Sequence, residues 1–363
     1  MILGIETSCD DSAVAILDMH GNIVANEISS QINFHDKYGG VVPEIASRQH
    51  LISLPILIRY VFEKYHINPN HLKAIAVTHA PGLIGSLLVG VSYAKSLAWV
   101  YNIPLIPVDH LEGHLLAPFL DNPELKFPYL GLIASGGHTH LVHARNLYDY
   151  ILLGKTIDDA VGEAFDKVAK MLGFQYPGGP VIDQIASSQP IADINFPIPL
   201  KGKKTLNFSF SGLKTAVRNE AITRKAYIEK MQLININAFE AFADSEQKKT
   251  VQNICASFQK VVSQIILERF KKALKFIKVD QIAVTGGVAA NTGIRTTLTD
   301  YARKRKIQAF FPSSKNCTDN AAMIAYTGLQ HFKNGIKFDS DYFALNASPK
   351  SRLSTLIVHD VFK

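Results

Sequence analysis

The chain carries the same local pattern twice, about 130 residues apart. Near its start, the segment "LGIETSCDDSAVAIL" places two short apolar runs either side of a polar turn at 7–12. The segment "YLGLIASGGHTHLVHA" repeats this arrangement around a polar turn at 135–140. Each pattern predicts two strands joined by a turn. Because hairpin strands followed by alternating strands and helices are typical of layered α/β domains, we expect an α/β fold of two duplicated subdomains.

Domain boundaries follow from the position at which the pattern restarts. We expect a first subdomain at 1–125, a second at 126–335 and a C-terminal tail at 336–363. A Pro- and Lys-rich stretch interrupts the second half, and we expect a helical insertion at about 176–250. Apolar periodicity predicts strands at 2–6, 13–17, 22–29, 74–78, 105–108, 281–285 and 308–311, and helices at 43–65, 85–101, 159–172, 250–275, 289–306 and 319–333.

Composition indicates a globular, basic protein. Of the 363 residues, 47% are apolar and 19% are charged, which predicts well-filled cores. The formal net charge is +7 and the pI is about 9.1. This charge favours an anionic partner such as RNA, although many basic proteins bind no nucleic acid. The candidate RNA-binding segments are Lys201, Lys203 and Lys204, residues 211–218, and the basic run at 303–306.

Three features bear on the cellular compartment. The three cysteines are few, odd in number and far apart, which favours a reducing cytosol over a disulfide framework. The start "MILGIETSCDD" has no basic region, so no signal peptide is predicted. The apolar run at 83–100 contains Lys95 and several serines, which predicts a buried helix rather than a membrane span. We therefore expect a cytoplasmic protein that does not enter a membrane.

The segment "VDHLEGHLLAP" sets two histidines four residues apart on a predicted helix. This spacing places His110 and His114 on one helical face, a common arrangement for binding a divalent metal, although hydrogen-bonded histidines have the same spacing. Asp109 is a suitable N-cap, with Glu112 at the capping-box position. A zincin protease needs its glutamate directly after the first histidine, where this chain has Leu111. Glu112 is rotated by about 200° from His110, which argues against a peptidase.

Paired glycines occur in three turns, at 133–140, 176–180 and 284–291. Backbone N–H groups exposed in such turns bind phosphate, whereas a single glycine turn is more often only a tight turn. None of the three matches the P-loop or the Rossmann glycine pattern. Three such turns in one half of a duplicated α/β chain favour a nucleotide cleft.

Several polar residues have an ordinary structural interpretation beside a functional one. Asp166 precedes Lys170 by four residues, which is the spacing of an exposed helical ion pair. Asp319 and Asn291 both stand at predicted helix starts, where such residues commonly act as caps. By composition alone, the structural role is favoured for each of the three residues.

Taken together, the motifs resemble the TsaD family, once labelled O-sialoglycoprotein endopeptidase. The resemblance runs from about residue 1 to 335, and no kinase-like extension follows, so the chain is similar to the bacterial form. The motifs appear in the family's order: "GIETSCDDSAVAI", "YGGVVPEIASRQH", "PGLIGSLLVG", "HLEGH", "IASGGHTHL", "GEAFDKVAKMLG", "YPGGP", "FSFSGLKTAV", "TGGVAAN" and "CTDNAAMIAY".

This resemblance implies an actin-like ATPase fold (ASKHA) built from two duplicated ribonuclease-H-like subdomains. It implies transfer of a threonylcarbamoyl group from threonylcarbamoyl-adenylate to N6 of adenosine 37 in tRNAs that read codons beginning with A, with release of AMP. It also implies one divalent metal per chain, usually iron and alternatively zinc. The implied partner proteins are TsaB, a pseudo-paralogue, and the ATPase TsaE.

The resemblance assigns roles to individual residues. His110 and His114 match the family's metal histidines, and Asp319 matches its third ligand. No side chain is identified as the proton acceptor. The implied substrate-binding residues are Ile133, Ala134, Ser135, Gly136 and Gly137 in the phosphate-side loop, with Asp166, Gly179, Asp183 and Asn291 along the nucleotide.

Two other functions remain open at this level. A metallopeptidase would use the histidine pair to cleave a glycoprotein, although the glutamate is misplaced for that chemistry. A non-catalytic nucleotide-binding scaffold would serve only as a platform for partners, although the metal pattern argues against it.

Overall fold

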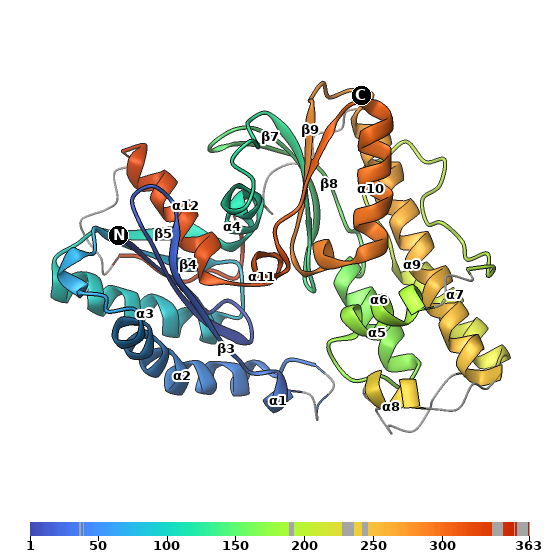
Figure 1. The fold of residues 1–363 in the computed structure, drawn as a ribbon, viewed down its shortest axis with the longest axis horizontal. Helices are drawn as coiled ribbons and strands as arrows, with labels where there is room; N and C mark the ends of the chain where they lie inside the picture. Colours follow the sequence, from blue (N-terminus) through green and yellow to red (C-terminus); the bar gives the residue numbers. More distant parts are fainter. Residues whose placement is uncertain are drawn as a thin grey trace. The chain divides into compact units, whose positions relative to one another are not determined.

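The computed structural model describes residues 1–35, 38, 40–188, 192–226, 236–241, 246–335, 344–351, 353 and 362. The chain forms two compact units. The first unit combines Met1–Glu124 with Pro312–Leu356, and the second combines Leu125–Phe311 with Ile357–Lys363 (Figure 1).

The first unit contains a five-stranded sheet of order β3-β2-β1-β4-β5. Strands β1, β2 and β3 pair antiparallel, and β4 and β5 join the sheet parallel to β1. The strands are β1 (Ile2–Glu6), β2 (Asp11–Leu17), β3 (Ile23–Ser30), β4 (Ala74–Ala80) and β5 (Leu105–Asp109). The helices are α1 (Ile32–His35), α2 (Pro43–Lys64), α3 (Ile84–Tyr101), α4 (His110–Leu116), α11 (Ser314–Cys317) and α12 (Ala321–Lys333), with short 3-10 turns at Pro69–His71 and Ala117–Leu120.

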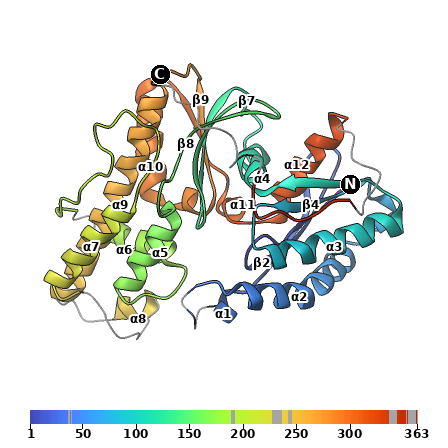
Figure 2. The same cartoon turned by 180° about the vertical axis from the view of Figure 1, so that it is seen from behind.

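Strand alternation explains how both faces of this sheet are covered. Leu3 and Ile5 of β1 point into a core shared with α2 and α3. Ile2, on the opposite face, belongs to a second core that includes α12. Figure 2 shows α2 and α3 on one side of the first sheet and α12 on the other.

The second unit repeats the topology, with a sheet of order β10-β9-β6-β7-β8. Here β6, β7 and β8 pair antiparallel, and β9 and β10 are parallel to β6. The strands are β6 (Tyr129–Ala134), β7 (Thr139–Asn146), β8 (Asp149–Lys155), β9 (Gln281–Thr285) and β10 (Gln308–Phe310). The helices are α5 (Val161–Met171), α6 (Gly178–Ser188), α7 (Ser211–Thr223), α8 (Ile236–Ala241), α9 (Glu246–Ala273) and α10 (Thr292–Arg305), with a 3-10 turn at Gly287–Ala290.

This shared order, three antiparallel strands followed by two parallel ones, confirms the duplicated α/β fold. The sequence did not predict β8, whose segment "DYILLGK" lacks regular alternation of apolar and polar residues. It also did not separate α6 from the rest of the expected insertion at 176–250. Parts of that insertion (189–191, 227–235 and 242–245) lie outside the described residues.

One boundary differs from the expectation. Residues 312–335, expected in the second subdomain, are part of the first compact unit. The physical reason is close packing of α12 on β1 and β4. Gly4 of β1 lies against Ala321 and Ala325, and Gly328 of α12 lies against Ala76 of β4. Side chains at these two glycines would hold the helix away from the sheet.

The tail expected at 336–363 is described only in part. Residues 344–351 belong to the first unit, where the backbone N–H of Ser348 donates to the carbonyl of His79 at 2.8 Å. The remaining tail residues, apart from 353 and 362, lie outside the described residues. In the part of the chain that the structure describes, no helix is both long enough and apolar enough to cross a membrane.

We predict that Gly4→Ala destabilises the protein by about 1–3 kcal/mol, because the new methyl group overpacks the junction of β1 and α12. An added Cβ would stand 2.8 Å from the backbone nitrogen of Ala325, which cannot move without shifting the helix. Chemical denaturation followed by circular dichroism measures the effect. Gly212→Ala is the matched control, since an added Cβ there meets no atom within 4 Å. Equal midpoints for both variants would contradict this packing.

Candidate active site

The histidine pair lies on α4, directly after β5. Asp109 ends the strand and caps the helix, because its carboxylate accepts hydrogen bonds from the backbone N–H groups of Leu111 (2.9 Å) and Glu112 (3.4 Å). This confirms the predicted N-cap. The cap fixes the first turn of the helix, so His110 and His114 lie on one face with ring centroids 4.6 Å apart. Both imidazoles are buried.

Asp319, just before α12, completes a set of three metal-ligand side chains. Its Oδ1 lies 3.0 Å from Nε2 of His114 and 3.6 Å from Nε2 of His110. One ligand atom from each residue falls within 4.8 Å of the others. Two imidazole nitrogens and one carboxylate are donors that suit a divalent transition metal and leave further coordination positions open. These residues therefore fit a metal ion.

Glu6, which the sequence analysis did not single out, orients the first histidine. Its Oε2 lies 3.0 Å from Nδ1 of His110, and Oγ of Ser8 lies 3.2 Å from the same nitrogen. Glu6 is itself held by a 2.6 Å hydrogen bond from Oγ1 of Thr78. A carboxylate on one ring nitrogen leaves the other nitrogen available as a ligand. The only sequence signal was an acidic residue at the end of an otherwise apolar strand.

The charges of this cluster favour a cation. Burial of the imidazole lowers the pKa of His110, but the carboxylates of Glu6 and Asp319 outweigh it and raise that pKa to about 9. Burial raises the pKa of Glu6, but the charge and hydrogen bond of His110 outweigh this and lower it below the ordinary value. The carboxylates of Glu6 and Asp319 therefore favour a positive charge at this position. A metal ion held here would compete with a proton for the imidazole of His110.

Glu112 contacts a different part of the unit. Its Oε2 lies 3.3 Å from Nε2 of His331 on α12, whereas Asp319 is the carboxylate beside the histidine pair. This agrees with the expectation that Glu112 faces away from the metal face. The arrangement does not reproduce the zincin geometry, in which the glutamate acts beside the metal.

The C-terminal segment supports the same helix. Oγ of Ser351 donates to Oδ2 of Asp109 at 2.6 Å, and Ser351 is fully buried. Since the other oxygen of Asp109 caps α4, the tail residue is linked to the histidines through the cap. The sequence gives no local signal for this contact, because the two residues are far apart along the chain.

In the second unit, the loop to which the family resemblance assigns the phosphate follows β6. Ile133 and Ala134 are its last strand residues, and Ile133 pairs in parallel register with Thr285 of β9. The turn closes through a 2.9 Å hydrogen bond from the backbone N–H of Ser135 to the carbonyl of His138. The two predicted glycine segments at 133–140 and 284–291 therefore meet at the carboxyl edge of the sheet.

The glycines of these turns fall into two groups. At Gly136 and Gly137 an added Cβ would meet no atom within 4 Å, so packing does not require glycine. Gly286 differs, because it has a φ of +89° and lies against the carbonyl of Ala134. Glycines without a packing role allow a ligand to approach the backbone N–H groups closely.

Helix α6 brings the remaining candidate residues together. Asp166 accepts a 2.8 Å hydrogen bond from the backbone N–H of Gly178, which starts α6. Next to it, Gly179 faces open space. Further along α6, Asp183 accepts from the backbone N–H of Thr292 at 3.0 Å and from its hydroxyl at 2.7 Å.

Asn291, beside Thr292, caps α10 by accepting from the backbone N–H of Ile294 at 3.0 Å. Its amide also donates to Gln259 at 2.8 Å. The structure thus brings Asp166, Gly179, Asp183 and Asn291 into one region of the second unit. Asp166 thus caps the start of α6, a role that the sequence analysis did not consider.

Comparison with known proteins identifies the family. Residues 22–326 match the sequence profile of TsaD, tRNA N6-adenosine threonylcarbamoyltransferase. A protein of that name from Thermosipho africanus is 44% identical over 353 residues, covering 97% of this chain and 100% of the relative. One from Clostridioides difficile is 41% identical, covering 97% of this chain and 98% of the relative.

Solved structures agree on the fold. Component A of (R)-2-hydroxyglutaryl-CoA dehydratase from Acidaminococcus fermentans aligns with a TM-score of 0.52 and 14% identity, covering 93% of this chain and 99% of that chain. Full-length HypF aligns with a TM-score of 0.55 and 13% identity, covering 96% of this chain and 56% of that chain. Both are actin-like ATPase-fold proteins. With the sequence match extending over most of its length, the chain belongs to the TsaD family of tRNA N6-adenosine threonylcarbamoyltransferases.

Proposed function

We propose that this tRNA N6-adenosine threonylcarbamoyltransferase takes its acyl group from threonylcarbamoyl-adenylate and releases AMP. The acceptor is N6 of adenosine 37 in tRNAs that read codons beginning with A. The observation that carries the proposal is the buried set of His110, His114 and Asp319, with Glu6 behind it, in a chain of this family.

The transfer forms one bond and breaks another. The N6 amine attacks the carbamoyl carbon, a C–N bond forms, the C–O bond to the adenylate phosphate breaks, and the amine loses a proton. An exocyclic adenine amine is a weak nucleophile, so the acceptor carbonyl needs to be activated and held in position. The protein is expected to supply both.

We propose that His110, His114 and Asp319 hold one divalent metal, iron(II) in preference to zinc. Imidazole and carboxylate donors suit both metals, so the ligand set alone is compatible with either. When bound, the ion supplies Lewis-acid chemistry that polarises an oxygen on the carbamoyl side. Glu6 keeps Nδ1 of His110 engaged, so that Nε2 remains directed toward Asp319.

For the adenylate, we propose that the phosphate binds along Ser135, Gly136 and Gly137, after Ile133 and Ala134. The absence of packing constraints at the two glycines supports this assignment. The nucleoside would lie along Asp166, Gly179, Asp183 and Asn291, all of which are held by α6 or the start of α10.

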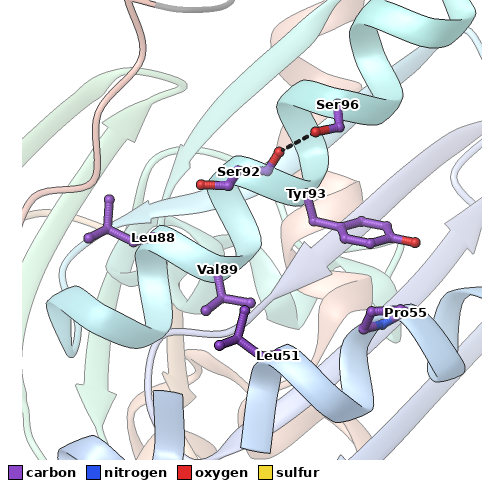
Figure 3. A pocket seen from close by; sticks show the side chains of 7 residues that line it. All are labelled: Leu51, Pro55, Leu88, Val89, Ser92, Tyr93 and Ser96. Atoms are coloured by element: carbon purple, nitrogen blue, oxygen red, sulfur yellow. Dashed lines mark hydrogen bonds between the residues drawn. The ribbon is translucent and has the colours of Figure 1, made fainter. Parts of the chain in front are cut away.

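We further propose that the protein acts in the cytoplasm with TsaB and the ATPase TsaE. A face of the first unit supports a protein partner. Helices α2 and α3 line an apolar groove containing Leu51, Pro55 and Leu88 (Figure 3). Ile56, the residue after Pro55 on α2, is 64% exposed, and such apolar exposure favours burial against another protein. We assign this face to TsaB.

The function is tested by reconstitution. The purified protein with TsaB, TsaE and the enzyme that makes the adenylate, supplied with threonine, bicarbonate, ATP and tRNA, should form N6-threonylcarbamoyladenosine. Nucleoside mass spectrometry detects the product. A tRNA with guanosine at position 37 is the negative control. Product formation that does not depend on this chain would contradict the proposal.

In this assay we predict opposite outcomes for two isosteric variants. Asp319→Asn should lose stoichiometric metal and lower the transfer rate by about 10²-fold or more, because an amide lacks the charge that offsets the cation. Glu112→Gln should keep its metal and most activity, since its carboxylate contacts His331 instead. Elemental analysis by mass spectrometry gives the metal content. If the Glu112 variant is inactive and the Asp319 variant is active, the assignment of the metal ligands is wrong.

We also predict that Gly137→Ala lowers the affinity for AMP by about tenfold while thermal stability is unchanged. The added methyl group has space in the protein but would occupy the space of the phosphate. Calorimetric titration with AMP measures this effect. Gly212→Ala, equally unconstrained by packing, should bind AMP as the wild type does. Unchanged AMP affinity in the Gly137 variant would show that this loop does not bind the phosphate.

For the partner surface, we predict that Ile56→Asp abolishes complex formation with TsaB without loss of fold. The side chain is already exposed, so the charge costs the isolated protein little. Size-exclusion chromatography with light scattering reports the complex. Ile222→Asp, at a 46% exposed position on α7, is the control. If the Ile56 variant still forms the complex, the partner binds elsewhere.

A further inference from the structure

The basic segments 201–204 and 303–306, both noted in the sequence, are linked in the structure by two further lysines at the end of α9. Nζ of Lys272, at the end of α9, donates to the carbonyl of Lys203 at 3.0 Å. Its neighbour Lys271 lies over the ring of Tyr301 on α10, with Nζ 5.5 Å from the ring centroid. The face formed by 201–204, 271–272 and 303–306 is called here the α9–α10 basic face.

The lysine loop of this face is held by a buried arginine. The side chain of Arg269 on α9 is fully buried, and its Nε donates to the carbonyl of Asn207 at 2.7 Å. Its Nη2 reaches the carbonyls of Pro199 and Leu200 at 3.4 and 3.5 Å. A guanidinium that bonds both ends of a loop fixes the loop between them. Residues 201–204 are therefore fixed against α9 while their lysines remain exposed.

The α10 side of the face is ordered in the same way. The guanidinium of Arg305 lies 6.0 Å from the centroid of Tyr301, so this ring contacts cations from both helices. Both views show α9 and α10 running alongside each other (Figures 1 and 2). Lys304, between Arg303 and Arg305, is exposed. A hydrogen bond and two ring contacts thus link the three basic segments, and the lysines at 201, 203, 204 and 304 are exposed.

Acidic side chains offset only part of this charge. Glu268 pairs with Lys272 at 3.0 Å, and Asp300 pairs with Arg303 at 3.5 Å. The third basic segment noted in the sequence, 211–218, has a different role at Lys214. Nζ of Lys214 lies 2.6 Å from Oδ2 of Asp159 in a partly buried ion pair. Lys214 thus contributes to packing, and the structure favours the α9–α10 basic face for an anionic ligand.

We propose that the α9–α10 basic face binds the phosphate backbone of the substrate tRNA. This inference rests on the proposed function and adds a location for the tRNA outside the reaction centre. Helix α10 begins beside Asn291 at the proposed nucleotide site and carries the basic face at its other end. A helix of 14 residues is about 21 Å long. The face therefore contacts tRNA remote from adenosine 37 and contributes affinity rather than chemistry.

Two variants with the same change of charge test the proposal. The face variant combines Lys203→Gln, Lys271→Gln and Lys304→Gln. The control combines Lys73→Gln, Lys126→Gln and Lys333→Gln, three exposed lysines in other segments. Filter binding of an unmodified tRNA transcript, between about 50 and 200 mM salt, gives the dependence of affinity on salt.

Each lost phosphate contact makes the slope of log K against log salt concentration less steep by about 0.7–0.9. If all three lysines contact phosphates, the slope of the face variant should be less steep by about 2–3. Its tRNA dissociation constant at low salt should rise about tenfold, and its KM for tRNA should rise with kcat unchanged. The control should match the wild type in every measurement. AMP affinity should be unchanged in both, because the nucleotide site is intact.

The proposal would be overturned if the wild-type enzyme modifies tRNA and the face variant binds tRNA with the wild-type affinity and salt slope. If the wild type itself forms no modified tRNA, the proposed function fails instead. Loss of binding to phosphatidylserine vesicles, with tRNA binding unchanged, would assign the face to an anionic membrane surface and overturn the proposal. A lower kcat with an unchanged KM would also contradict it, because that result requires a role in the chemical step.

Discussion

The buried contact between Glu6 and His110 is the interaction on which the first unit's site depends. Glu6 ends β1, His110 begins α4 and Thr78, which also bonds Glu6, lies on β4. One carboxylate therefore joins two strands to the helix that carries the histidines. A buried carboxylate is costly unless it is paired and hydrogen-bonded, and this one is both. The same contact holds His110 in the orientation that directs its second nitrogen toward Asp319.

The duplicated fold uses one topological position for two purposes. In the first unit, the last residue of β1, Glu6, and the turn residue Ser8 both contact the histidine site. In the second unit, the corresponding turn after β6 has paired glycines that face open space. The sheets have equivalent strand orders, so the two positions correspond although their residues differ. An acidic turn fits a cation, and a glycine turn exposes the backbone N–H groups that fit an anion.

Sequence reasoning succeeded where the controlling interactions are local. The spacing of His110 and His114 predicted a shared helical face, and Asp109 was identified as the cap from its position before the apolar run. Both depend on residues within one turn of helix. The two hairpins were equally visible, because strand alternation and polar turns are local patterns.

Prediction from the sequence failed for residues whose contacts depend on tertiary packing. Asp319 meets the histidines only because α12 packs on the first sheet, which no local pattern near residue 319 reveals. The family resemblance supplied Asp319, whereas the residues alone did not. Glu6 and Ser351 were missed for the same reason, since each acts on α4 from a distant part of the chain.

The most direct test of the metal assignment is anomalous diffraction at the iron absorption edge from crystals of the anaerobically purified protein. We predict one strong anomalous peak per chain, which marks an iron ion bound by Nε2 of His110, Nε2 of His114 and the carboxylate of Asp319. A peak bound by Glu112 and His331, or bound iron without contact to the histidine pair, would contradict it.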